Sequence, residues 1–112
     1  DMQYWVARDP GSDNVVGTAG LYHYAEDKHE AAWLGWFGVV EEARGAGVGR
    51  ELLQGAIDEA RARGKKFLRL FTSDDPAEAR AQVMYEARGF RVVGCTPPDA
   101  DGIKIYYREL AL

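Results

Sequence analysis

Apolar and polar side chains alternate along several short segments of this chain, and they recur every three or four residues along two longer ones. Alternation is typical of strands with one buried face, whereas the longer period is typical of helices that pack on one side. Clusters of Gly, Pro, Asp and Asn separate the segments, as expected for turns. The pattern predicts strands at residues 2–8, 15–24, 31–40, 65–72, 90–96 and 103–110, and helices at 48–63 and 77–88.

The order of these elements predicts an α/β (α+β) domain. Strands joined by short loops pair antiparallel, whereas the helix at 48–63 separates two strands that then become parallel neighbours. We therefore expect a mixed, mostly antiparallel twisted sheet with helices on both faces, formed by residues 1–112 as a single domain. Gly35 and Gly38 interrupt the third strand and predict either a bulge in it or the close approach of another backbone.

A glycine-rich turn, Arg44-Gly-Ala-Gly-Val-Gly-Arg50, joins the third strand to the first helix. The first amides of a helix have no partner within it, so together with the positive end of the helix dipole they attract anions. Glycine permits positive φ and leaves the backbone accessible, and the two arginines can bind phosphate oxygens. The turn predicts a phosphate or pyrophosphate site, although a glycine-rich turn can also serve only as a helix start.

Neither of the best-known phosphate loops fits this turn. A dinucleotide fingerprint needs a glycine where the chain has Arg50, and a P-loop needs Lys and Ser or Thr where it has Arg50 and Glu51. The remaining pattern is Arg44-x-x-Gly47-x-Gly49. It resembles the acyl-CoA pyrophosphate motif of the GNAT superfamily of N-acyltransferases, Gln/Arg-x-x-Gly-x-Gly/Ala.

A second segment carries the same resemblance at the expected distance after the turn. GNAT enzymes share the pattern Asn-x-x-Ala-x-x-x-Tyr-x-x-x-Gly-Phe, and here Ala81, Tyr85, Gly89 and Phe90 occupy its places. The chain departs from the pattern at the Asn position, which is Glu78. The resemblance extends from about residue 3 to the end of the chain.

The resemblance implies a GNAT-like fold and the transfer of an acetyl group from acetyl-CoA, the cosubstrate, to an amine of a small molecule or protein in a ternary complex. A backbone N–H near Val39 would stabilise the oxyanion of the reacting thioester. The cofactor contacts that the resemblance implies are Phe37, Val39, Val40, Arg44, Gly45, Ala46, Gly47, Val48, Gly49, Arg50 and Glu78.

Tyr85 is the expected general acid, because the resemblance places it where the CoA thiolate leaves and a phenol with a pKa of about 10 carries its proton at neutral pH. The alternative for Tyr85 is a core residue. No motif fixes the base that deprotonates the amine. Glu41, directly after the bulged strand, is our candidate, and Glu42, Asp74, Asp75 and His23 are the alternatives.

Composition narrows the function further. The formal charge of −4 and the pI near 5.1 argue against a nucleic-acid partner, and the single cysteine, Cys95, excludes an internal disulfide and a multi-cysteine metal site. We expect no metal. Without an apolar run of membrane-spanning length or a recognisable signal peptide, we expect a soluble cytoplasmic protein with no membrane partner.

GNAT proteins normally place one strand and two helices ahead of the hairpin with which this sequence starts, and those helices line the acceptor pocket. Three explanations stay open: a fragment, a homodimer in which a second copy supplies the missing wall, or an open acceptor site. Two other functions also stay open. One is a non-catalytic acyl-CoA-binding or regulatory domain, and the other is a small α/β domain that binds a different phosphate ligand.

Overall fold

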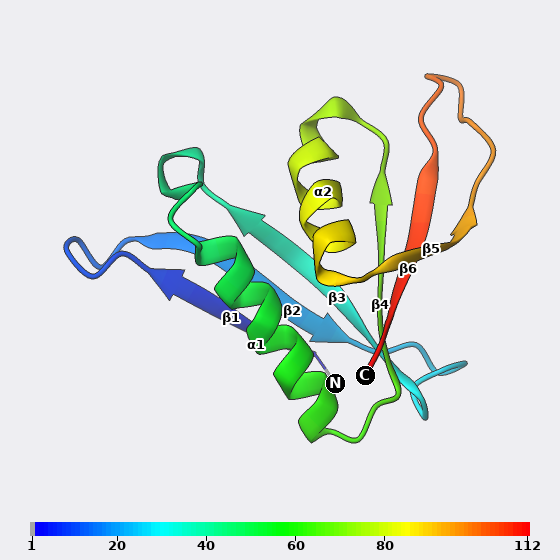
Figure 1. Ribbon diagram of the computed structural model, residues 1–112, viewed down its shortest axis with the longest axis horizontal. Helices are drawn as coiled ribbons and strands as arrows, with labels where there is room; N and C mark the ends of the chain where they lie inside the picture. The colour runs from blue at the N-terminus through cyan, green and yellow to red at the C-terminus, as the bar shows by residue number, and fades with distance from the viewer. Residues whose placement is uncertain (1) are drawn as a thin grey trace.

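Six strands form one sheet in the order β1-β2-β3-β4-β6-β5 in the computed structural model, which describes residues 2–112 (Figure 1). Every predicted strand and helix is present, and both ends of each element lie within two residues of their predicted positions. The strands are β1 (Gln3–Arg8), β2 (Val15–Tyr22), β3 (Ala31–Val39), β4 (Phe67–Ser73), β5 (Arg91–Cys95) and β6 (Ile105–Ala111). The helices are α1 (Val48–Ala62) and α2 (Ala79–Arg88), preceded by the 3-10 turns η1 (Glu41–Ala43) and η2 (Pro76–Glu78).

The predicted mixed, mostly antiparallel sheet is confirmed. β3 and β4 are the parallel pair, and the four other neighbouring pairs are antiparallel. The parallel pairing is short, because it joins only residues 31–33 to residues 67–69. Beyond that point the two strands diverge, and Figure 1 shows their carboxyl ends far apart. The sheet therefore opens into a V between β3 and β4.

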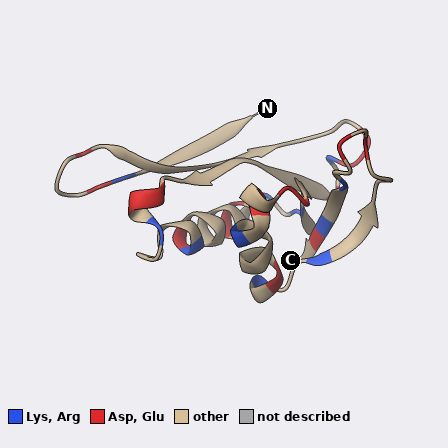
Figure 2. Ribbon diagram, turned by 90° about the horizontal axis from the view of Figure 1, so that it is seen from above, with Lys and Arg blue, Asp and Glu red and all other residues tan. Residues whose placement is uncertain are grey.

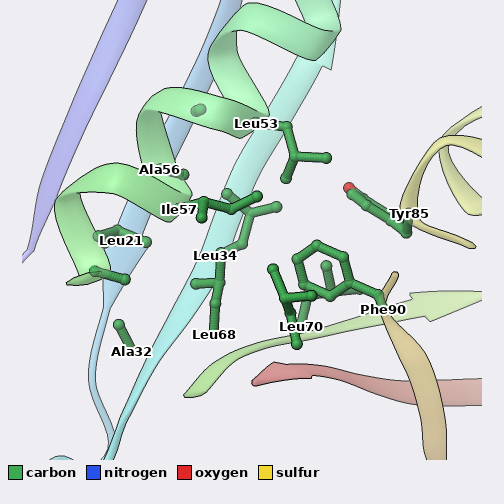
Figure 3. Close-up of a cluster of buried hydrophobic side chains, with 13 residues drawn as sticks. Leu21, Ala32, Leu34, Leu53, Ala56, Ile57, Leu68, Leu70, Tyr85 and Phe90 are labelled. Carbon is green, nitrogen blue, oxygen red and sulfur yellow. The ribbon is translucent and has the colours of Figure 1, made fainter. Parts of the chain in front are cut away.

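Both helices lie on the same face of the sheet, which corrects the expectation of helices on both faces (Figure 2). One buried cluster joins strand residues to residues of both helices (Figure 3). Its members are Ala19, Leu21, Ala32, Leu34, Leu68, Leu70 and Leu110 from the strands, Leu53, Ala56, Ile57 and Ala60 from α1, Tyr85 from α2, and Phe90. The other face carries Arg69, which is ion-paired to Asp27 at 2.8 Å and to Glu109 at 2.8 Å, so it is not apolar throughout.

α1 is the amphipathic helix that the periodicity predicts. Its buried side chains lie three or four residues apart and face the sheet. It ends as predicted at Gly64, which has φ 76° and donates its amide to the Arg61 carbonyl at 2.9 Å. Within residues 2–112, neither helix has the length and apolar character needed to span a membrane.

The predicted bulge is present in β3. Thr18 of β2 pairs with Gly38 and Gly20 pairs with Gly35, so three steps along β3 correspond to two along β2. The extra residue is Trp36, whose φ of 49° lies in the left-handed region. The Thr18 hydroxyl donates to the Trp36 carbonyl and holds the bulge in place.

The bulge reverses the alternation of side chains along β3. Leu34 points into the core, and regular alternation would direct Trp36 there as well. Instead, the Trp36 side chain is exposed, and its ring centroid lies 5.6 Å from that of Tyr22. The Phe37 ring packs on α2, with its centroid 5.9 Å from that of Tyr85. The last residues of β3 therefore turn toward the helices.

Candidate active site between the glycine-rich turn, β3 and α2

A cavity of about 380 Å³ lies between the end of β3, the glycine-rich turn and the start of α2. The first two segments follow each other directly in the sequence, whereas α2 comes about 30 residues after the turn and forms the opposite wall of the cavity. The residues that line the cavity are Phe37, Gly38, Val39, Ala43, Arg44, Gly45, Gly47, Gly49, Arg50, Ala77, Glu78, Arg80, Ala81, Met84 and Tyr85.

The turn has the left-handed conformation expected from its glycines. Gly45 has φ 87° and Gly47, the N-cap of α1, has φ 86°. Within residues 2–112, the amides of these two glycines donate to no backbone carbonyl. The first three amides of α1 also have no acceptor within the helix. Several N–H groups are therefore available to an anion in the cavity.

Gly49 has a different role from Gly45 and Gly47. A Cβ at this position would lie 3.5 Å from Met84 Sδ and 3.5 Å from Val39 Cγ2. The start of α1 therefore packs closely against both β3 and α2. Gly49 keeps the walls of the cavity together, whereas the other two glycines provide the shape of the turn.

Positive charge gathers in the cavity although the chain is acidic. Arg44 and Arg50 come from the turn, as expected, and Arg80 comes from α2 on the opposite wall. The Arg44 Nε donates to the Val39 carbonyl at 3.3 Å, which keeps this side chain at the end of β3. Three arginines therefore face one glutamate, Glu78, in a protein of net charge −4.

Tyr85 is buried, with 4% of its surface exposed, and it lines the cavity. Its ring packs 5.9 Å from Phe37 and 5.7 Å from Phe90, and Figure 3 shows it reaching from α2 toward Leu53. In the described part of the chain, no side chain or carbonyl hydrogen-bonds its hydroxyl. Burial raises the pKa of this phenol, the negative charge of Glu78 raises it further, and Arg108 lowers it. The hydroxyl thus carries its proton at neutral pH.

Glu78, at the place of the Asn in the GNAT pattern, is tied to the end of β4. Its Oε2 accepts a hydrogen bond from the Ser73 amide at 3.0 Å and another from the Ser73 hydroxyl. The carboxylate therefore joins β4 to the turn that begins α2 while it lines the cavity.

Four of the expected site residues, Val40, Ala46, Val48 and Glu41, do not line the cavity. The Val40 amide donates to the Val16 carbonyl at 2.8 Å, and the Val48 side chain faces Gly17 of β2. Glu41 is exposed in η1, so its role as the base stays a prediction.

The alternative bases also lie outside the cavity. Glu42 is exposed in η1. Asp74 accepts from the Lys104 amide at 2.9 Å, and Asp75 caps η2 by accepting from the Ala77 amide at 2.8 Å. His23 lines a separate hollow together with Lys28, Arg63 and Lys65, and burial and the charges of Lys65 and Arg63 lower its pKa.

Sequence reasoning missed Arg80, Ala77 and Met84 as cavity residues. A signal for them existed, because residues three or four apart in a helix share a face. Ala77, Ala81 and Met84 follow that spacing toward Tyr85, so the assignment of one residue to the cavity implies the others. Arg80 has the same signal, because it lies three residues after Ala77 and four before Met84.

The family model for the acetyltransferase (GNAT) domain matches residues 1–92. No protein of curated function matches the sequence closely enough to count as a relative. Among solved structures, a GCN5-related N-acetyltransferase from Kribbella flavida is 27% identical with a TM-score of 0.81, covering 99% of this chain and 68% of its own. Nourseothricin acetyltransferase is 25% identical with a TM-score of 0.84, covering 99% and 65%.

A third structure shares the fold at lower identity. A GNAT family acetyltransferase from Elizabethkingia anophelis with acetyl-CoA bound is 17% identical with a TM-score of 0.83. The match covers 99% of this chain and 76% of that one.

Proposed function

Because the chain belongs to the GNAT family of acetyltransferases, we propose that it transfers an acetyl group from acetyl-CoA to an amine in the cavity between β3, the glycine-rich turn and α2. One observation carries this proposal: the turn, the bulged end of β3 and Tyr85 all line the same cavity. The N-acetyltransferase from Kribbella flavida, at 27% identity, supports an amine as the acceptor.

The cavity suits the phosphate groups of acetyl-CoA. The unpaired amides of Gly45 and Gly47 and the first turn of α1 would bind the pyrophosphate, with Arg44 and Arg50 adding charge-assisted hydrogen bonds. Arg80 supplies further positive charge from the opposite wall. A Cβ at Gly38 would meet no atom within 4 Å, so the edge of β3 leaves room for the rest of the molecule.

The open edge of β3 supports a role in stabilising the reacting carbonyl. The Val40 amide points to β2, where it bonds to Val16. Because successive strand residues direct their N–H groups to opposite edges, the Val39 amide points toward the V. Such a donor would stabilise the negative charge that develops on the thioester oxygen when the amine attacks.

Tyr85 would act as the general acid. The amine nitrogen forms a bond to the acetyl carbon, the carbon–sulfur bond breaks, and the phenol proton moves from Tyr85 to the departing sulfur. The raised pKa of Tyr85 keeps that proton in place until the thiolate forms. The amine loses one proton in the same reaction, and this proton restores the phenol through solvent, with Glu41 as the proposed base.

Release of the CoA thiol tests the proposal. Acetyl-CoA binding is first measured by calorimetry, and thiol release is then followed with a panel of primary amines, including polyamines, aminoglycosides and lysine peptides. We expect saturable binding of acetyl-CoA and thiol release that depends on at least one amine. Binding without amine-dependent release would favour a non-catalytic acyl-CoA-binding domain, and absence of binding would contradict both functions.

A further inference from the structure

Arg108 is a buried arginine on β6, directly beneath α2. Only 4% of its surface is exposed. Its Nη2 donates to Gln82 Oε1 at 2.8 Å and to Glu86 Oε1 at 3.1 Å, both on α2. The guanidinium therefore connects the sheet to the helix that carries Tyr85.

For a purely structural contact, this arrangement is energetically unfavourable. Burial of a guanidinium is unfavourable unless its charge is paired and all its donors are bonded. Here the Nε is buried and has no hydrogen-bond partner in the described part of the chain. The carboxylate partner, Glu86, has 62% of its side chain exposed, so water screens part of the pair. An apolar residue at this place would avoid these costs.

The contacts of Arg108 fix the part of α2 that contains Tyr85. Gln82 and Glu86, one helical turn apart, are both held by the same guanidinium. Gln82 also donates to the Ser73 carbonyl at the end of β4, at 2.7 Å. Tyr85 lies between Gln82 and Glu86 in the sequence, so its backbone is anchored on both sides.

Charge adds to this mechanical effect. Two charged groups of the described chain act on the Tyr85 phenol: Glu78 disfavours loss of the proton and Arg108 favours it. A proton donor becomes negatively charged when it gives up its proton. A nearby positive charge that is already fixed in a buried place stabilises that state without reorganisation.

We propose that Arg108 is a positioning residue that anchors α2 to β6 and stabilises the Tyr85 phenolate formed when the proton passes to the departing CoA sulfur. This inference rests on the proposed function of Tyr85 as general acid. Arg108 does not touch the substrate in this account. It exchanges no proton, and the phenolate is reprotonated by the proton that the amine releases.

The first experiment measures the acidity of residue 85 without any acceptor. Replacement of Tyr85 by 3,5-difluorotyrosine makes the phenol more acidic and allows its titration to be followed by fluorine NMR in the otherwise intact chain. We expect Arg108→Met to raise the pKa of this phenol and Glu78→Gln to lower it. Arg108→Lys, which keeps the charge, should leave the pKa closer to that of the parent.

Arg91→Met is the matched control, because the Arg91 side chain lies on β5 and is 78% exposed. It should not change the pKa. Should Arg108→Met fail to fold by circular dichroism, Arg108→Gln replaces it, since the amide can still bond Gln82. An unchanged pKa in the folded variant that lacks the charge would overturn the electrostatic role.

The second experiment is a double-mutant cycle with acetyl-CoA and the amine of highest turnover. We expect Arg108→Met to lower kcat about tenfold in the parent but to have little effect in the Tyr85→Phe background, with a similar acetyl-CoA KM throughout. Equal effects in both backgrounds would overturn the role of Arg108 alone. Full activity of Tyr85→Phe would instead refute the proposed general acid, so the two failures can be distinguished.

Discussion

Substitution of Gly47 by valine tests whether the turn binds the cofactor, because Gly47 needs a backbone conformation that valine disfavours. Its φ of 86° lies in the left-handed region, where a side chain costs about 1–2 kcal/mol. Space is not the obstacle, since the nearest atom to a Cβ there is Arg50 Nη2 at 3.8 Å. The variant should therefore fold, with a melting temperature lower by about 5–10 °C.

The loss in binding should exceed what the strain alone explains. A chain that relaxes the strain moves the amides around Gly47 away from the pyrophosphate, and each hydrogen bond to a charged group contributes about 1.5–3 kcal/mol. Loss of one such bond raises the Kd for CoA by about tenfold or more. Calorimetry with CoA measures this change, and denaturant unfolding measures the stability.

Gly64→Val is the matched control. Gly64 also has a left-handed φ, 76°, and a Cβ there would meet no atom within 4 Å. It lies at the opposite end of α1, about 22 Å from the turn for a helix of this length. The two variants should lose similar stability, but only Gly47→Val should lose CoA affinity. Equal CoA affinity in the parent and in Gly47→Val would refute the assignment of the turn.

Three further substitutions test other parts of the site. Tyr85→Phe should lower kcat by about 10²-fold at unchanged acetyl-CoA affinity, since the phenol acts only in the transition state. Steady-state kinetics measure kcat, and full activity of the variant would rule out this role of Tyr85. Arg44→Glu should weaken CoA binding by calorimetry and reduce its dependence on salt, whereas an unaltered salt dependence would remove Arg44 from the phosphate site. Thr18→Val removes the hydroxyl that holds the bulge, so it should lower kcat while changing the melting temperature little. A normal kcat would show that the bulge does not need this hydrogen bond.

Local patterns were enough to predict the elements and much of the cavity. Alternation, helical period and turn residues each depend on neighbours in the sequence, so the strands and helices could be located within two residues. Gly35 and Gly38 also indicated the bulge. The turn from Arg44 to Arg50 could be assigned to an anion because the glycines and the helix start are adjacent in the chain.

Features that depend on contacts between distant residues could not be predicted. The left-handed backbone conformation of Trp36 is held by the Thr18 hydroxyl of β2, and no residue of β3 by itself requires that conformation. The face on which α2 packs depends on the shared core of Tyr85 and Leu53 rather than on the sequence of either helix. In the sequence, Arg108 resembles an ordinary polar residue of an alternating strand. It is buried because α2 packs over it.

Amide NMR can detect the proposed binding of acetyl-CoA in the cavity between the glycine-rich turn, β3 and α2 without any acceptor amine. In a titration of the nitrogen-15-labelled protein with CoA, the largest saturable shift changes should occur at Gly45, Gly47 and Val39. The amides of Gly64 and Gly102, which lie outside the cavity lining, should change little. Saturable changes confined to other regions, or no saturable change at all, would refute binding of acetyl-CoA in this cavity.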